Sequence, residues 1–204
     1  MDSFPDLSTY KALIFDLDGT LINSMPLHVL AWTTVYKERG YAINPQTIYD
    51  LGGMSSKDVV LYFNRHGLEI NDVDAFVARK VEVYRSHFDK LHTFKPIENI
   101  LRDGKAKGQL IGIGTGTQRV NVDTILNFLN LDKCVDVSVS ANDVTRHKPF
   151  PDTFLKAAQL LKLQPCECIV LEDGPLGIKS ALDGGFDCIE VENGSFKRGI
   201  LKPE

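Results

Sequence analysis

Five short apolar segments recur along the chain with the pattern of buried strands. They are residues 12–15, 110–113, 135–139, 168–171 and 188–191, each four or five residues long, rich in β-branched side chains and bounded by Gly, Asp or Lys. Runs of this length between turn residues favour strands over helices. We therefore expect five strands, one near the start of the chain and four in its second half.

Three stretches between the later segments repeat apolar side chains at helical spacing. They are residues 118–130, 152–162 and 175–184, and the first is expected to bury Val120, Ile125, Leu126 and Leu129 on one face. A strand that alternates with a helix in this way predicts a parallel sheet with helices on both faces.

The interval between the first two strands is too long for a single crossover. Roughly 90 residues separate Phe15 from Leu110, whereas one crossover needs about a dozen or more. Residues 28–39, 55–66 and 72–91 within it have helical patterns, and Pro26 suits the first turn of the first helix. We expect a helical cap of residues 25–93, inserted into an α/β core of residues 1–24 and 94–204. The polar segment 193–204 is expected to be a loose tail.

Composition narrows the class of protein without naming a function. The 204 residues are 43% hydrophobic and 25% charged, with a net charge of −4, as in ordinary globular proteins. Negative charge argues against broad binding to nucleic acid or to an anionic membrane, and no apolar run approaches the ~20 residues of a membrane span. The N-terminus lacks the apolar region of a secretory signal. Four sparse cysteines, at positions 134, 166, 168 and 188, are expected to be free thiols in a reducing cytoplasm.

Candidate chemistry begins where the first expected strand ends. The chain continues there as Asp16-Leu17-Asp18-Gly19-Thr20. Two carboxylates two positions apart in a strand point the same way and repel, so the pair requires a bridging cation or a proton. A solvated Asp-x-Asp-Gly turn would explain the same spacing.

Three further strand ends carry polar motifs. Gly114-Thr115-Gly116-Thr117 opens a helix, where a hydroxyl and free amides can bind an anion. Lys148-Pro149 offers a cation, and Leu171-Glu172-Asp173-Gly174 offers oxygen ligands for Mg²⁺. Alone, each motif is compatible with an ordinary turn or a surface lysine. Together they follow the carboxyl ends of parallel strands, the edge at which open α/β sheets bind ligands.

In motif order and spacing, the chain resembles the haloacid dehalogenase superfamily of phosphotransferases over essentially its whole length. The insertion resembles the small helical cap of the branch that holds β-phosphoglucomutases and sugar-phosphate phosphatases. Residues 147–154 with Glu172-Asp173 are similar to bacterial fructose-1-phosphate phosphatases. The resemblance implies a three-layer, Rossmann-like α/β fold with sheet order 5-4-1-2-3 and a cap of the four-helix type.

The resemblance also implies catalytic roles. Asp16 matches the nucleophile that forms an aspartyl-phosphate, and Asp18 matches the general acid/base, whose backbone carbonyl also coordinates Mg²⁺. Lys148 matches the lysine that stabilises the nucleophile and the transferring phosphoryl group.

The remaining core motifs match phosphate and metal sites of that superfamily. Thr115 and Gly116, with Thr117 beside them, match the phosphate-binding loop. Glu172 and Asp173 match the acids that complete a Mg²⁺ site with Asp16 and Asp18. The implied cofactor is therefore Mg²⁺.

Two side chains at the start of the cap are candidate substrate contacts. His28 and Trp32 are four residues apart and share a helix face. The resemblance places both at the junction of cap and core, with His28 near Asp18. A tryptophan in the cap's own core would explain Trp32 equally well.

Residues 52–57 resemble the cap loop that meets the substrate, with Gly53 and Ser56 as candidate contacts. In β-phosphoglucomutases this loop presents a lysine and an arginine, whereas Gly52 and Ser56 occupy the matching positions here. Lys57 is adjacent, but a helix directs it about 100° away from Ser56. A mutase needs a basic fork for a second phosphate, and its absence favours hydrolysis, as does Thr20, where mutases usually have valine.

We therefore expect a Mg²⁺-dependent phosphatase of small phosphorylated sugars, fructose 1-phosphate-like or related, or of polyols, acting as a monomer or weak dimer. One alternative is a phosphosugar mutase. Another is a non-enzymatic phospho-acceptor or binding module. A dehalogenase fits less well, because Asp18 and the Glu172-Asp173 pair suit metal-assisted phosphoryl transfer.

Overall fold

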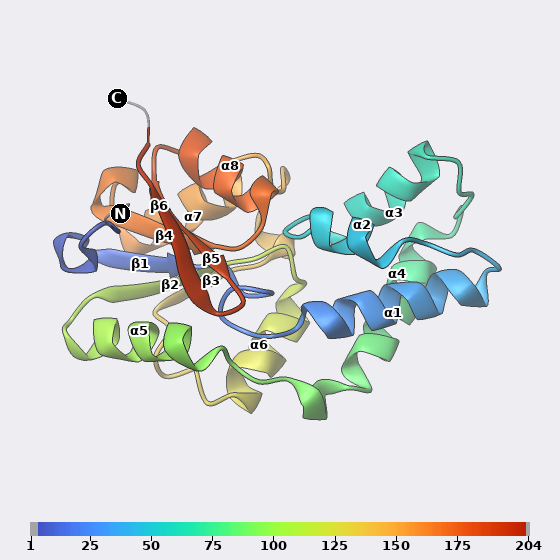
Figure 1. The fold of residues 1–204 in the computed structure, drawn as a ribbon, viewed down its shortest axis with the longest axis horizontal. Coiled ribbons are helices and arrows are strands. Elements are labelled where there is room, and N and C mark those ends of the chain that lie inside the picture. The colour runs from blue at the N-terminus through green and yellow to red at the C-terminus, as the bar shows by residue number, and fades with distance from the viewer. Residues whose placement is uncertain (1–3, 203–204) are drawn as a thin grey trace.

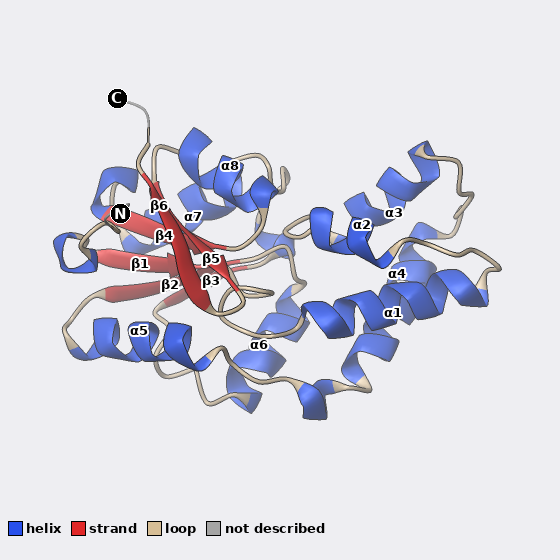
Figure 2. Ribbon diagram, viewed as in Figure 1, coloured by secondary structure: helices blue, strands red, loops and turns tan. Residues whose placement is uncertain are grey.

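A six-stranded sheet forms the centre of the larger body in the computed structural model, which describes residues 4–202 (Figures 1 and 2). The strands are β1 (Ala12–Phe15), β2 (Leu110–Gly114), β3 (Val137–Val139), β4 (Cys168–Glu172), β5 (Asp187–Glu192) and β6 (Ser195–Ile200). Their order is β3-β2-β1-β4-β5-β6, and the first five are parallel. The predicted order 5-4-1-2-3 is confirmed, with β6 as an added edge strand.

The end of the chain is not the loose tail that its polarity suggested. β6 pairs with β5 in antiparallel fashion, and Glu192 faces Ser195 across a two-residue turn. Asn193 and Gly194 in that turn have positive φ values of 50° and 75°, as tight hairpins require. The Asn-Gly dipeptide is therefore the sequence feature that indicates this hairpin. Residues 203–204 of the expected tail lie outside the described residues.

Helices cover both faces of the sheet, because successive strand side chains point to opposite faces. Leu13 and Phe15 of β1 pack with α5 (Lys95–Ala106) and α6 (Arg119–Phe128), whereas Ala12 and Ile14 pack with α7 (Asp152–Leu161) and α8 (Pro175–Asp183). Figure 1 shows these helix pairs on opposite sides of the sheet. All four residues of β1 and all five of β4 are buried, which explains their continuous apolar sequence.

Two details of the core helices differ from expectation. α6 buries Val122, Ile125 and Leu126, whereas Val120 is 54% exposed, so the expected inner face was wrong at Val120. Leu129 lies beyond the last residue of α6 and is only partly buried. α5 was not among the helices expected from the sequence.

Four α-helices lie between β1 and α5 and form the smaller body beside the sheet (Figure 1). They are α1 (Met25–Glu38), α2 (Pro45–Asp50), α3 (Ser56–Arg65) and α4 (Val73–Arg85). α1 begins three residues earlier than expected, with Pro26 in its first turn. Buried aromatic residues, among them Trp32, Tyr36 and Phe76, hold these helices together.

The two chain segments that join the bodies run side by side. Ile22 pairs with Thr93 in an antiparallel bridge, and the Phe94 amide donates to the Leu21 carbonyl at 2.9 Å. The Thr93 hydroxyl in turn donates to the carboxylate of Glu98, in the first turn of α5. The connection is therefore anchored to the core on both sides.

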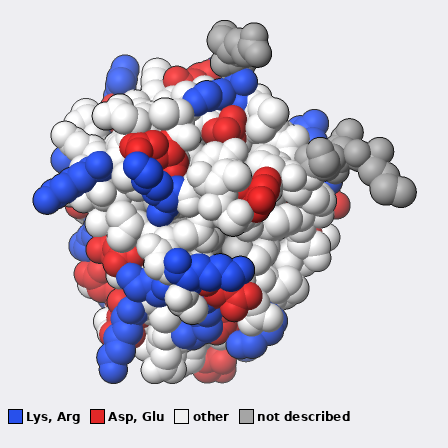
Figure 3. Space-filling model, turned by 90° about the vertical axis from the view of Figure 1, so that its left-hand side faces the viewer, with Lys and Arg blue, Asp and Glu red and all other residues white. Residues whose placement is uncertain are grey.

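The surface far from the cap carries both signs of charge. Figure 3 shows Lys and Arg side chains intermixed with Asp and Glu on this face. The coloured side chains on this face therefore form no continuous positive patch of the kind that would attract a polyanion. Across residues 4–202, no helix is both long and apolar enough to traverse a bilayer.

Candidate active site

The polar motifs meet at one edge of the sheet, as expected for residues that follow parallel strands. Asp16 follows β1, Thr115 follows β2, Lys148 lies in the loop after β3, and Glu172 ends β4. Neighbouring strands in register place these ends together, with Phe15 opposite both Ile113 and Leu171.

Lys148 is the buried cation at the centre of this edge. Its Nζ donates to Asp16 Oδ1 at 2.6 Å and to Glu172 Oε1 at 2.7 Å, and its side chain is 1% exposed. Burial acts to lower the pKa of Lys148, but the two carboxylates outweigh burial and raise it. Lys148 therefore stays protonated. The Glu172 carboxylate also accepts from the Gly174 amide at 2.6 Å, which fixes its orientation.

One lysine does not balance the acids around Asp16. Asp16, Glu172 and Asp173 can each place one carboxylate oxygen within 4.8 Å of the others. Burial raises the pKa of Asp16 well above its ordinary value against the attraction of Lys148, and the neighbouring acids raise it further. Burial and Glu172 likewise raise the pKa of Asp173 to about 7. This buried excess of carboxylate oxygens suits a hard divalent cation, so the residues present fit the Mg²⁺ implied by the resemblance.

The Asp18 side chain lies outside this acidic cluster and faces the cap. Its Oδ1 accepts from the Ser24 hydroxyl at 2.6 Å and lies 3.0 Å from His28 Nε2, and its Oδ2 accepts from the Thr117 hydroxyl at 2.7 Å. Thr115 Oγ1 lies farther away, at 3.4 Å. Burial acts to raise the pKa of Asp18, but His28 and the hydroxyl donors outweigh it and hold the pKa low. A coordinating role for the Asp18 backbone carbonyl stays a prediction.

Lys80 of α4 is, like Ser24, a site residue that the sequence analysis missed. Its Nζ lies 2.7 Å from His28 Nδ1, and the residue is 3% exposed. Because an ammonium only donates, Nδ1 accepts, and a neutral His28 then carries its proton on Nε2, toward Asp18. The available signal was its helical position: Lys80 shares a face with Phe76, Val77 and Tyr84, which are all buried. A lysine at such a position is directed toward the packed side of the helix, where it needs a polar partner.

A cavity between cap and core joins these groups. Its core side is lined by Asp16, Asp18, Thr115, Gly116 and Thr117. Its cap side is lined by His28, Trp32, Lys80, Gly53 and Ser56, together with the apolar Met25, Ile48, Leu51 and Val59. The structure therefore brings every sequence-predicted cap residue to this cavity. Lys57 points elsewhere and pairs with Asp74 at 2.7 Å.

The cap loop and the phosphate-binding loop touch through backbone at two glycines. A Cβ atom at Gly116 would lie 2.6 Å from the Gly53 carbonyl oxygen. Gly53 has a φ of +87°, and a Cβ there would lie 3.0 Å from Lys148 Cδ. Only glycine accommodates this close approach without displacing the loops.

Comparison with known proteins groups this chain with hydrolases and phosphotransferases of one fold. The family model described as "Haloacid dehalogenase-like hydrolase" matches residues 13–191. Fructose-1-phosphate phosphatase YqaB of Escherichia coli is 31% identical over 186 residues, which cover 89% of this chain and 96% of that protein. β-Phosphoglucomutase of Bacillus subtilis is 29% identical over 192 residues, 90% of this chain and 84% of that protein. A solved β-phosphoglucomutase from Clostridium difficile superposes with a TM-score of 0.79 at 26% identity, covering 89% of this chain and 84% of that one.

Proposed function

Because the chain belongs to the haloacid dehalogenase-like hydrolase family, we propose that it is a Mg²⁺-dependent phosphatase of small phosphorylated sugars or polyols. The proposal rests on one observation: Lys148 forms buried ion pairs with Asp16 and Glu172, beside a cavity that is lined by Asp16 and Asp18. The relatives that match include a sugar-phosphate phosphatase, fructose-1-phosphate phosphatase YqaB.

Asp16 is the proposed nucleophile. Its carboxylate attacks phosphorus, an Asp16 O–P bond forms, and the bond between phosphorus and the sugar oxygen breaks. Lys148, 2.6 Å from Asp16 Oδ1, orients the carboxylate and faces the charge that develops on the phosphoryl oxygens. Thr115 and Gly116 bind those oxygens from the other strand end. Asp16, Glu172 and Asp173 would hold Mg²⁺, which when bound neutralises phosphoryl charge.

Asp18 is the proposed carrier of the proton. The leaving sugar oxygen takes a proton from Asp18, and Asp18 then takes one from the water that hydrolyses the aspartyl-phosphate, so that phosphate leaves and Asp16 is restored. The contacts Lys80–His28 and His28–Asp18, at 2.7 and 3.0 Å, form a path that can protonate Asp18 before the first step. Along it the Lys80 ammonium gives a proton to His28 Nδ1 while His28 Nε2 gives its proton to Asp18, so that the imidazole stays neutral and Lys80 becomes an amine.

The test is phosphate release from a panel of sugar and polyol phosphates, with and without Mg²⁺. We expect release only with Mg²⁺, and we expect Asp16→Asn to abolish it, because an amide is a far weaker nucleophile than a carboxylate. Asp74→Asn is the matched control, since Asp74 is an exposed acid of the cap whose side chain is 82% exposed. Undiminished turnover by the Asp16 variant would refute the nucleophile assignment.

Mutase activity is the second candidate, because Lys80 places one cation at the cap end of the cavity. Its Nζ already contacts His28, and among residues 4–202 no second lysine or arginine lines the cavity. A basic fork for a distal phosphate is therefore incomplete, which favours hydrolysis. Interconversion of glucose 1- and 6-phosphate, primed by a bisphosphate and with little free phosphate, would instead establish the mutase.

A further inference from the structure

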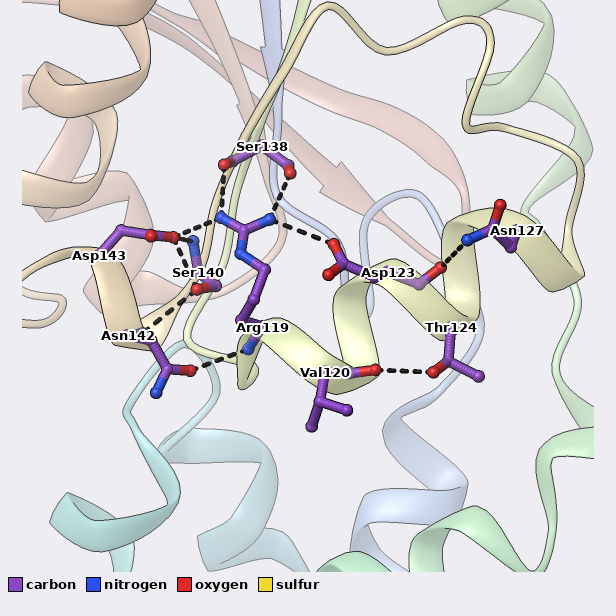
Figure 4. Close-up of polar contacts among 9 residues, drawn as sticks. All are labelled: Arg119, Val120, Asp123, Thr124, Asn127, Ser138, Ser140, Asn142 and Asp143. Carbon is purple, nitrogen blue, oxygen red and sulfur yellow. Dashed lines mark hydrogen bonds and ion pairs between the residues drawn. The ribbon is translucent and has the colours of Figure 1, made fainter.

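Arg119 stands behind the phosphate-binding loop, at the first residue of α6 (Figure 4). Its guanidinium donates to the Ser138 hydroxyl at 2.6 Å, to the Ser138 carbonyl at 2.7 Å and to the Asp123 carboxylate at 3.3 Å, and it also pairs with Asp143. Its backbone amide donates to Asn142 Oδ1 at 2.9 Å. Arg119 does not line the cavity. One side chain therefore joins α6 to β3 and to the short 3₁₀ helix Ala141–Asp143.

The same 3₁₀ helix holds Thr117. The Ala141 amide donates to the Thr117 carbonyl at 2.9 Å, and the Thr117 hydroxyl donates to Asp18 Oδ2 at 2.7 Å. Asp143, the ion-pair partner of Arg119, also accepts from the Ser140 amide at 2.7 Å, which closes the start of the 3₁₀ helix. The contacts thus continue from Arg119 through the 3₁₀ helix and Thr117 to Asp18.

The Thr115 backbone is held by β3 and not by the 3₁₀ helix. Its amide donates to the Val139 carbonyl at 2.9 Å and so continues the pairing of β2 with β3. The Thr117 amide also donates to Thr115 Oγ1 at 3.0 Å, so the Thr115 hydroxyl is linked to Thr117. A disturbance of the 3₁₀ helix would therefore move Thr117 first, while β3 keeps the Thr115 backbone in place.

We infer that Arg119 is a positioning residue that sets the Thr117 hydroxyl against Asp18, an inference that rests on the proposed phosphatase function. The Arg119 side chain is 33% exposed, and exposed ion pairs add little stability. The role of Arg119 is therefore geometric. Its planar guanidinium donates to four acceptors at fixed angles, whereas the ammonium of a lysine would be a single point charge.

The experiment is a double-mutant cycle on phosphate release. We expect Arg119→Met and Thr117→Val each to lower kcat roughly 10-fold, since a 1 Å misplacement of a catalytic group can cost up to about 100-fold, with KM within about threefold. Because both act on one hydrogen bond, the double variant falls no further than either single variant. Arg119→Lys stays within about twofold of Arg119→Met. The matched control is Arg79→Met, which removes a comparable guanidinium fork to Glu38 and Glu82 in the cap and leaves kcat unchanged.

Multiplicative losses in the double variant would overturn the inference, because a general loss of folded enzyme multiplies with any local effect. Amide spectra give a readout independent of turnover: Arg119→Met or Arg119→Lys must shift the Thr117 and Ala141 signals, and Arg79→Met must not. Unshifted signals overturn the inference even when no substrate is found. Normal turnover in the Arg119 variants, beside an inactive Asp16→Asn, refutes the inference alone. Absence of phosphate release by the wild type refutes the proposed function.

Discussion

Lys80 is a buried ammonium whose one hydrogen-bond partner among residues 4–202 is the neutral imidazole of His28. Its Nζ also lies 5.2 Å from the ring centre of Trp32 and 5.0 Å from that of Tyr84, and such aromatic contacts offset part of the cost of burying charge. Burial nevertheless lowers the pKa of Lys80 to about 8, against the attraction of Asp18. Since a lysine in the unfolded chain has a pKa near 10.5, Lys80 destabilises the folded state below pH 8, and the penalty fades as pH rises toward 10.5.

Replacement of Lys80 should therefore change stability and activity in opposite directions. We expect Lys80→Met to raise the free energy of unfolding at pH 7 by about 1–3 kcal/mol, because it removes a buried charge that its contacts compensate only in part. The gain should vanish above about pH 10. Phosphate release should fall at least roughly 10-fold, because His28 loses the donor that orients its proton. Urea unfolding at pH 7 and pH 10, beside steady-state kinetics, measures both effects. The control Lys57→Met, at an exposed pair, should change neither, and a destabilised Lys80 variant would contradict the burial argument.

At the scale of elements, the sequence predicted the strands and helices that the pattern of their own residues determines. It missed those features that depend on contacts with other elements. The parallel strands and α7 carry continuous or periodic apolar patterns, so their positions followed directly. The polarity of residues 195–200 concealed β6, since an edge strand needs little apolar surface and its hairpin signal lay in Asn193-Gly194 alone. Val120 was assigned to the wrong face of α6, because apolar residues also occur singly on surfaces.

Glu98, in the first turn of α5, stabilises the segment that connects the core to the cap. Its carboxylate, with an 8% exposed side chain, accepts from Thr93, from Lys95 at 3.1 Å and from Arg102 at 2.7 Å. Burial acts to raise the pKa of Glu98, but these donors outweigh it and lower the pKa to about 2, from 4.5. A depressed pKa of this kind adds stability above pH 4.5 that is lost as pH falls toward 2.

Glu98→Gln should therefore destabilise the protein in a pH-dependent way. At pH 7 we expect a loss of about 1–3 kcal/mol, the upper value corresponding to the full pKa shift. The difference from wild type should shrink to less than half of that at pH 3, where the Glu98 contribution is largely lost. Chemical unfolding at both pH values provides the measurement. Glu82→Gln, at a 67% exposed partner of Arg79, should stay within about 0.5 kcal/mol; an equal loss at both pH values for Glu98→Gln would contradict the charge argument.

At the scale of the molecule, the candidate site exists only where cap and core meet. The core motifs were visible in sequence, because each follows a strand and the carboxyl ends of parallel strands share one edge. The cap contribution was visible only in part: His28 and Trp32 stood out, whereas Ser24 and Lys80 gain their roles from packing across the cavity. The backbone contact of Gly53 with Gly116 likewise depends on how two distant loops meet, which no local pattern encodes.

The acidic cluster links this assembly to the proposed metal. Without a divalent cation, Asp16, Glu172 and Asp173 crowd around one lysine, and the pKa of Asp173 rises to about 7 from 3.8. A raised carboxylate pKa means that the folded state becomes less favourable as pH increases from 3.8 to 7. A cation that binds the folded chain alone relieves this repulsion and stabilises it by mass action.

Asp173→Asn should separate the repulsion among the buried acids from the stabilisation by a bound cation. In EDTA at pH 7 we expect the variant to melt at a higher temperature than wild type, because one repelled buried carboxylate is gone. On addition of Mg²⁺ the Tm of wild type should rise, whereas that of the variant should respond weakly, since an amide oxygen is a poorer ligand than a carboxylate. Asp183→Asn, at an exposed pair with Lys179, should follow wild type in both conditions. A variant that is less stable in EDTA yet keeps the full Mg²⁺ response would mean that Asp173 serves the packing around Gly19 and Thr20 rather than the metal.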